Sequence, residues 1–262
     1  MSSTASEGPL RGLPPVLLSA WGIAQNTTKG PKPRWSLDQI LNTAVALGDA
    51  HGVEAITMSR VAKTLGGGTM SMYRYVQSRE DLLVLAADAA LGRPPHLAAE
   101  EGWRARTHAW VAAMRDTYRS HPWLSSLPIT GEALMPSYVR WMEAGLGSLE
   151  GSELPGGEAV TVLTLLWTYV RSDAELGAGL AESLPASART APEVNAYLAE
   201  RLRVADRHDE FPRLRAILES ENPADGGESF DDTDFALAID VILDGVAARR
   251  RALRDVKVRS DR

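Results

Sequence analysis

The hydrophobic positions of this chain follow the spacing of α-helices along most of its length, and few segments alternate as β-strands do. The first clear amphipathic run follows Ser36, where Ser36-Leu-Asp-Gln39 has the form of a capping box, and it ends at His51-Gly52. Thr57, Thr69 and Ser78 are suited to cap three further helices. The N-terminal part of the chain therefore predicts a cluster of four helices.

The second and third of these helices are short and separated by glycines. The helix after Thr57 is expected to end at Gly66, and Thr69 is expected to cap a helix that runs to about Tyr75. Two short helices joined by a tight turn are the helix-turn-helix pattern, whose second helix can enter the major groove of DNA. The three consecutive glycines, Gly66–Gly68, predict a loosened turn and leave the first residue of the recognition helix open.

The remaining two thirds of the chain is also expected to be helical. Arg93-Pro-Pro95 breaks the pattern and marks a domain boundary. Helices are then expected near residues 101–120, 134–149, 158–182, 192–206 and 211–220. A last helix, capped by Asp232 or Thr233, is expected to end at Arg249-Arg-Arg251, where positive charge suits a helix C-terminus.

Residues 1–34 are rich in Ser, Pro, Gly and Thr and show no sustained period, so they predict a flexible arm. Pro15–Trp21 is an apolar exception with the potential to dock on the folded part. The arm ends in a basic, proline-stiffened piece that carries Lys29, Lys32 and Arg34. These three side chains can follow a minor groove or phosphate backbone, as basic arms do, or they can belong to a solubilising tail.

Charge is distributed unevenly along the chain. Residues 29–91 hold seven basic and six acidic side chains, whereas the whole chain has a net charge of −6, so residues 92–262 carry −7. The absence of cysteine excludes disulfides, cysteine-ligated zinc fingers and thiol nucleophiles. No run has the length of a membrane span, and the first residues lack the pattern of a signal peptide, which favours a cytoplasmic, nucleoid-associated protein without membrane contact.

The N-terminal pattern resembles that of the TetR family of transcriptional repressors. The matching residues are Thr57, Val61-Ala62, Leu65-Gly66-Gly67, Met72-Tyr73-Arg74-Tyr75-Val76, Ser78-Arg79 and Asp81-Leu82-Leu83. The resemblance implies an all-α fold, with a helix-turn-helix DNA-binding domain over residues 35–92 and a larger helical ligand-binding and dimerisation domain over 96–262. It also implies a repressor that binds a palindromic DNA operator as a homodimer and is released by a small hydrophobic or aromatic effector. The tetracycline-repressor-like branch is the nearest in pattern.

A recognition helix needs short polar and basic side chains near its N-terminus, where bases and phosphates meet free N–H groups. The candidate DNA-binding residues are Arg34, Thr57, Ser59, Gly68, Thr69, Met70, Ser71, Tyr73, Arg74, Tyr75 and Arg79. Whether Arg74 reaches a guanine or only a phosphate is left open by the sequence. The alternative is a solvated helix in an unrelated helical domain.

Five of the seven tryptophans lie between residues 103 and 167, more than a plain helical core needs. The candidate residues for an effector pocket are Trp103, Trp110, Met114, Trp141, Met142, Trp167 and Tyr169. Burial in an ordinary core explains each of them equally well. The last apolar helices, including residues 234–248, are the expected dimer interface.

Catalysis and metal binding find little support in the sequence. The five histidines lack metal-ligand spacing, and no nucleophile motif or phosphate-binding glycine loop is present, so no cofactor, metal or enzymatic activity is expected. Two rivals to the effector-controlled repressor remain: a helical enzyme with a small-molecule pocket, and an architectural DNA-binding protein without an effector. The long apolar C-terminal region argues against the second.

Overall fold

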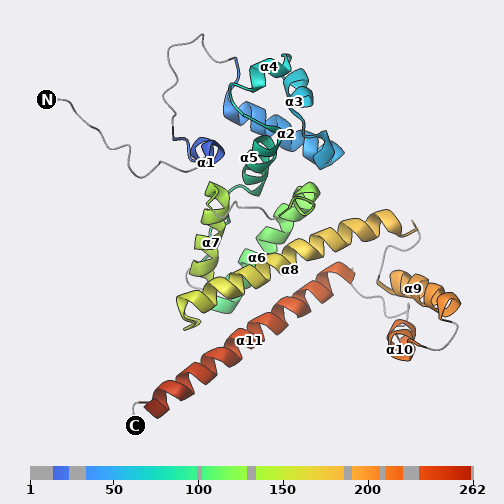
Figure 1. Ribbon diagram of the computed structural model, residues 1–262. Coiled ribbons are helices and arrows are strands. Elements are labelled where there is room, and N and C mark those ends of the chain that lie inside the picture. The colour runs from blue at the N-terminus through green and yellow to red at the C-terminus, as the bar shows by residue number, and fades with distance from the viewer. Residues whose placement is uncertain are drawn as a thin grey trace. The chain divides into compact units, whose positions relative to one another are not determined.

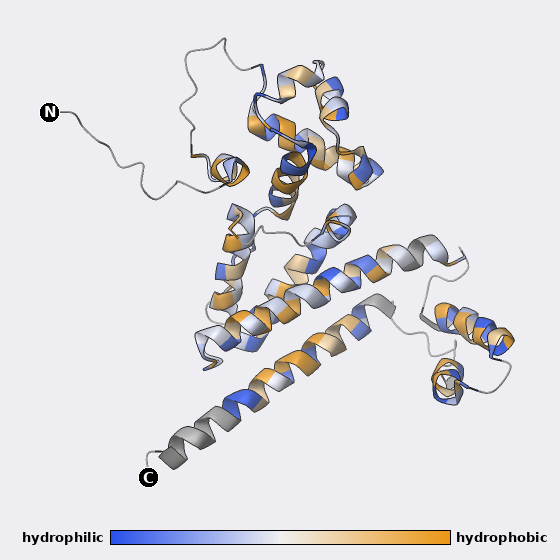
Figure 2. Cartoon of the chain, viewed as in Figure 1, coloured by the Kyte–Doolittle hydropathy of each residue, from blue (hydrophilic) through white to orange (hydrophobic). Residues whose placement is uncertain are grey.

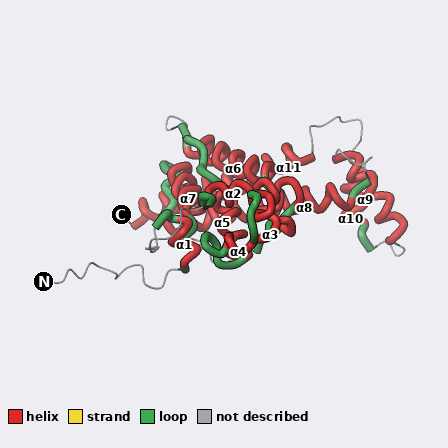
Figure 3. Tube along the Cα trace, turned by 90° about the horizontal axis from the view of Figure 1, so that it is seen from above, coloured by secondary structure: helices red, strands yellow, loops and turns green. Residues whose placement is uncertain are grey.

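The computed structural model describes residues 14–23, 34–98, 102–128, 134–185, 191–206, 210–220 and 230–260. Within these ranges all regular elements are helices joined by loops, as Figure 3 shows. The expected all-α fold is confirmed. None of the helices in these ranges is long and apolar enough to cross a bilayer.

Figure 1 labels the helices in chain order. The α-helices are α1 (Pro15–Ala20), α2 (Leu37–His51), α3 (Met58–Thr64), α4 (Thr69–Met72), α5 (Arg79–Leu91), α6 (Trp103–Ser120), α7 (Pro136–Ser148), α8 (Gly156–Ser183), α9 (Ala191–Ala205), α10 (Pro212–Ser220) and α11 (Phe230–Ser260). Two 3₁₀ turns, η1 (Val53–Ala55) and η2 (Pro122–Leu124), lie between them.

Helices α2–α5 form what we call the reading head. Helices α2, α3 and α5 begin where the sequence predicts, because side-chain oxygens accept from otherwise unpaired backbone N–H groups. The capping box is complete: Ser36 Oγ accepts from Gln39 N at 3.1 Å, and Gln39 Oε1 accepts from Ser36 N at 2.8 Å. Thr57 and Ser78 cap α3 and α5 in the same manner. Helices α2 and α5 pack together over a core that buries Ile40, Val61, Met72 and Leu82 completely.

The recognition helix α4 differs from expectation at both ends. Gly68, not Thr69, is the N-cap, because Gly68 adopts the extended backbone of a capping position and its carbonyl accepts from Ser71 N at 3.0 Å. The helix ends at Met72 and not at Tyr75. Tyr75 N bonds back to Met72 O at 2.8 Å, which closes a tight turn in place of another helical turn.

The last helix is longer than expected. Helix α11 begins at Phe230, ahead of the expected caps Asp232 and Thr233, and continues past Arg251 to Ser260. No glycine or proline follows Arg251, and arginine, alanine and leucine are good helix formers, so nothing in the sequence ends the helix there. The three arginines therefore lie within the helix and not at its C-terminus.

Residues 1–171 form one compact unit and residues 172–262 a second, so the division falls within α8. In the first unit α5 packs on both α6 and α7, which brings the reading head and the following helices together. The expected break at Arg93–Pro95 is thus a loop inside a compact unit, and the expected domain limits remain a functional prediction. In the second unit α9 and α10 pack on each other, and α11 buries one face formed by Phe235, Ile239, Leu243 and Val246.

Candidate nucleic-acid interface and aromatic cluster

The glycine turn between α3 and α4 is held by Arg34 and Trp35, the two residues before the α2 N-cap Ser36. Arg34 Nη2 donates to Gly66 O at 2.5 Å, and the buried Trp35 donates from Nε1 to Leu65 O at 3.3 Å. A Cβ at Gly67 would lie only 2.3 Å from Cζ2 of Trp35. The expectation of a loosened turn is therefore wrong: glycine at position 67 makes room for an indole ring that packs directly on the turn.

This fixed turn sets the orientation of α4. Met72 and Val76 point into the core, whereas Met70 is 82% exposed, Tyr73 is 52% exposed and Arg74 is exposed. Gly68 is also exposed, and Thr69 and Ser71 are half-buried. Six residues on either side of the buried Met72 are here called the reading surface: Gly68, Thr69, Met70, Ser71, Tyr73 and Arg74. Its side chains include a thioether, hydroxyls and a guanidinium, the groups that contact thymine methyls, phosphates and guanine edges.

Tyr75 and Arg34 stabilise the glycine turn and its neighbour Trp35. The Tyr75 hydroxyl accepts from the backbone N–H of Trp35 at 3.1 Å, and the two rings are 6.1 Å apart. The Arg34 guanidinium lies 5.6 Å from the centre of the Trp35 ring. Both side chains thus support the structure next to the reading surface. Lys29 and Lys32, the other expected basic residues of the arm, lie outside the described residues.

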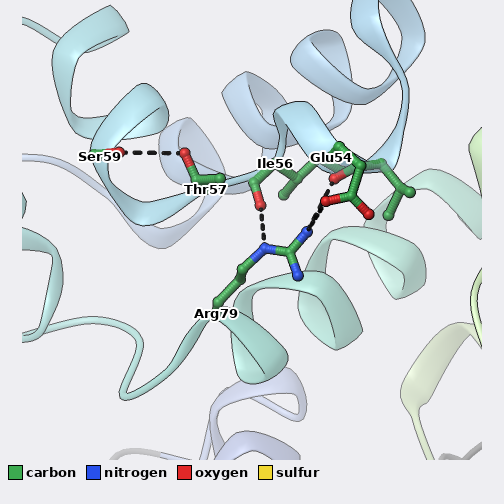
Figure 4. Close-up of polar contacts among 6 residues, drawn as sticks. Glu54, Ile56, Thr57, Ser59 and Arg79 are labelled. Atoms are coloured by element: carbon green, nitrogen blue, oxygen red, sulfur yellow. Dashed lines mark hydrogen bonds and ion pairs between the residues drawn. The ribbon is translucent and has the colours of Figure 1, made fainter.

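Arg79 also makes contacts within the protein, which Figure 4 shows together with the start of α3. Its Nε donates to Ile56 O at 3.1 Å, and Nη2 lies 3.3 Å from Glu54 Oε2. These contacts tie the first residue of α5 to the segment before α3, so we do not include Arg79 in the proposed DNA contacts. Thr57 accepts from Arg60 N at 3.2 Å as the α3 cap, and its hydroxyl lies 3.3 Å from that of the exposed Ser59.

Three of the candidate effector residues meet in one aromatic cluster. Trp110, Trp141 and Trp167 pack edge-to-face, with ring centres 6.2–6.4 Å apart, and Tyr138 lies 4.9 Å from Trp167. Their indole N–H groups have partners: Trp110 donates to Trp141 O at 2.9 Å, Trp141 to Leu91 O at 3.0 Å and Trp167 to Tyr118 Oη at 3.1 Å.

Small residues allow this close packing. A Cβ at Gly145 would lie 2.9 Å from Leu163 and 3.0 Å from Trp110. Trp110, Trp141 and Met114 are fully or almost fully buried. The other candidates, Trp103, Met142 and Tyr169, are half-buried. The cluster is thus a densely packed core in this structure, and the ligand-binding role of its residues remains a prediction.

Two sets of polar contacts link the reading head to α6, η2 and α7. Asp49 Oδ1, near the end of α2, accepts from Trp123 Nε1 at 2.8 Å and lies 2.7 Å from His121 Nδ1. Asp88 of α5 accepts from the N–H of Ser137 at 2.8 Å. Burial raises the pKa of the Asp88 carboxyl, although this hydrogen bond works in the opposite direction.

Sequence reasoning missed the residues that lock these elements together. Trp35 shows no local signal beyond its position before a capping box. Gly67 departs from the usual family pattern of the turn, and the reason becomes clear only from the indole ring that packs on it. Tyr138 lies at helical spacing from Trp141 and was open to inclusion in the aromatic set. Asp49 is more than seventy residues from His121 and Trp123, so no motif joins the three.

The locked helix-turn-helix, its exposed reading surface and the helical remainder define the class: an all-α DNA-binding regulator. Residues 95–250 match the family described as "Tetracyclin repressor-like, C-terminal domain". The HTH-type transcriptional repressor DrrR1 of Streptomyces coeruleorubidus is 37% identical over 57% of this chain and 56% of that protein. An HTH-type transcriptional regulator of Saccharopolyspora erythraea is 30% identical over 75% of this chain and 79% of that protein. The match thus spans about half the length of the first relative and most of the second.

Solved structures show the same fold. Apo ActR from Streptomyces coelicolor has a TM-score of 0.67 and 24% identity, over 86% of this chain and 100% of ActR. ActR in complex with (S)-DNPA has a TM-score of 0.62 and 25% identity, over 84% of this chain and 99% of ActR. The chain belongs to the TetR family of transcriptional regulators.

Proposed function

We propose that this protein is a repressor that binds a palindromic operator as a homodimer in the cytoplasm, with the reading surface of α4 in the major groove. The observation that carries the proposal is the exposure of Met70 on α4, and of Tyr73 and Arg74 directly after it, beside a turn that is locked by Trp35. Side chains that read bases must be both accessible and rigidly placed. One head contacts few base pairs, so twofold symmetry is needed for useful specificity.

Exposed apolar side chains on two long helices support the homodimer. On α8 these are Val160, Leu165 and Leu176, and on α11 they are Leu237 and Val241. Figure 2 shows that hydrophobic residues recur along both helices. Exposed apolar side chains mark association surfaces, and Leu237 and Val241 lie four positions apart on one face of α11, so we propose α11 as part of the dimer interface.

The aromatic cluster supports an aromatic effector. An aromatic molecule that enters between Trp110, Trp141 and Trp167 must move at least one ring, because the rings are packed and their N–H groups are paired. Movement of Trp141 breaks the hydrogen bond from its indole N–H to the carbonyl oxygen of Leu91. Leu91 is the last residue of α5 and therefore of the reading head. Effector binding would thereby favour a different head position, which requires only that the effector bind that state more tightly. ActR, a member of the same fold, has been solved with (S)-DNPA.

The test of DNA binding starts from selection of a palindromic site out of random DNA. Arg74→Ala should weaken binding to the selected operator by about 1–3 kcal/mol per half-site, since it removes one charged contact. Arg201→Ala removes the same charge from an exposed position on α9 and serves as the matched control. Unchanged affinity of the Arg74 variant, with an unchanged circular dichroism spectrum, would show that α4 does not read the operator.

The effector is tested separately. Tryptophan fluorescence should be quenched when an aromatic effector binds, with (S)-DNPA as the first compound tested, and Trp110→Ala should reduce both quenching and release from the operator. Operator binding without a response to any such compound would favour the architectural DNA-binding protein instead.

A further inference from the structure

The short helix α1 precedes the reading head and docks on it. Leu17 is only 8% exposed, and α1 packs against α5, beside which it lies in Figure 1. Its six residues are too few for a helix that is stable alone in water, so its helical form depends on docking. The segment is therefore part of the folded protein and not of a free arm.

The same segment contacts the protein beyond the head. Trp21, the residue after α1, donates from Nε1 to the carbonyl of Leu134 at 2.8 Å, across 113 positions of sequence. Leu134 lies two residues before α7, which carries Tyr138 and Trp141 of the aromatic cluster. One ten-residue piece, residues 14–23, thus holds the reading head through Leu17 and the start of α7 through Trp21.

The docking of α1 is incomplete. A cavity of about 340 Å³ lies between this segment and the residues that follow α4. Val16, Ser19 and Ile23 line one side of it, and Tyr73 and Arg74 line the other. Close packing on every side would make α1 an inseparable part of the core. Contact at a few points, one of them a single hydrogen bond, makes it an element that can attach and detach.

We propose that α1 is a detachable strap that ties the reading head to the start of α7 and so restricts the orientation of the head. A restrained head loses less freedom when a dimer engages two half-sites, so the strap favours DNA binding without touching DNA. This affinity effect rests on the proposed repressor function, whereas the strap itself does not. Its two anchors are Leu17 on the head side and Trp21 on the α7 side.

Hydrogen exchange tests the strap without DNA. Trp21→Phe keeps an aromatic ring but removes the N–H donor, and it should speed amide exchange in residues 16–20 about fivefold, the equivalent of one net hydrogen bond. Leu17→Ala should speed exchange in α1 and also at the start of α7, because release from the head frees the second anchor. Ser19→Ala, which loses only a bond to Pro15 O within α1, is the control and should leave α7 unchanged.

Operator binding then tests the consequence. Trp21→Phe and Leu17→Ala should each weaken binding to the selected operator about fivefold, not additively, with the salt dependence of binding unchanged. A reduced salt dependence would overturn the proposal, because α1 would then contact DNA directly. Unchanged exchange at the start of α7 in both variants would also overturn it. Failure of the selection to yield an operator would instead count against the proposed repressor function, since the exchange results do not depend on DNA.

Discussion

Gly67→Ala is the most specific perturbation that the structure offers. The added Cβ would lie 2.3 Å and 2.5 Å from two carbons of the Trp35 ring, well inside van der Waals contact. Trp35 is buried and its indole N–H donates to Leu65 O, so displacement of the ring costs both packing and this hydrogen bond. Overpacking of this kind costs about 1–3 kcal/mol. Because the backbone at Gly67 is not left-handed, the cost is steric and not conformational.

Gly68→Ala is the matched control on the adjacent residue. No atom lies within 4 Å of a Cβ at this position, and the backbone is extended. We expect the control to change the free energy of unfolding by only a few tenths of a kcal/mol, through a slightly weaker N-cap. Urea unfolding should therefore separate two substitutions that are chemically identical.

A double-mutant cycle with Trp35→Ala identifies the cause. Once the ring is gone, Gly67→Ala should cost almost nothing, which gives a coupling energy of about 1–3 kcal/mol between the two positions. Operator affinity should fall for Gly67→Ala, because a displaced turn moves the reading surface. Equal stability of the two glycine variants, or the same cost with and without Trp35, would refute the reasoning.

Two further predictions concern α5 and α11. Asp88→Asn should remove one pH-dependent contribution to the free energy of unfolding. Burial raises the pKa of the Asp88 carboxyl above 3.8, so the folded state binds this proton more tightly than the unfolded state does. The stability of the wild type therefore falls as pH rises through the raised pKa. Urea unfolding across acidic and neutral pH should show the variant losing less stability than the wild type over this window; parallel curves would contradict it. Val241→Glu should yield monomers by light scattering, whereas Val204→Glu on α9 should not, although these valines are similarly exposed at 63% and 69%. Two dimeric variants would exclude α11 from the interface.

The helices of the reading head are predictable because their signals are local. A capping serine and its glutamine partner lie three residues apart, so Ser36 and Gln39 specify the start of α2 without help from the rest of the chain. Thr57 and Ser78 act over the same distance. The boundaries of α4 and α11 were predicted less well, because α4 ends through a tight turn at Tyr75 and α11 meets no helix-breaking residue after Arg251.

Contacts between distant residues account for what the sequence does not reveal. From its position in the sequence, Arg79 is a candidate to contact DNA beside the recognition helix. In the structure its guanidinium instead donates to Ile56 O and Glu54 Oε2, which precede α3. Trp35 and Gly67 are separated by more than thirty residues, and only the fold shows that the ring requires the glycine. The tryptophan count led to the prediction of an effector pocket, which stays a prediction, while the pairing of indole N–H groups depends on partners such as Leu91 O that composition cannot indicate.

The contacts that hold the reading head also determine how much free energy a change in its position requires. Five hydrogen bonds join the head or α1 to the helices beyond it: Trp123 and His121 to Asp49, Ser137 to Asp88, Trp141 to Leu91 and Trp21 to Leu134. At about 0.5–1.5 kcal/mol net for each bond, their combined contribution is a few kcal/mol. A nearly complete shift between two states requires a ligand to distinguish them by about 5.5 kcal/mol. The two values are comparable, so an effector that repositions the head must bind the repositioned state more tightly by a few kcal/mol per protomer.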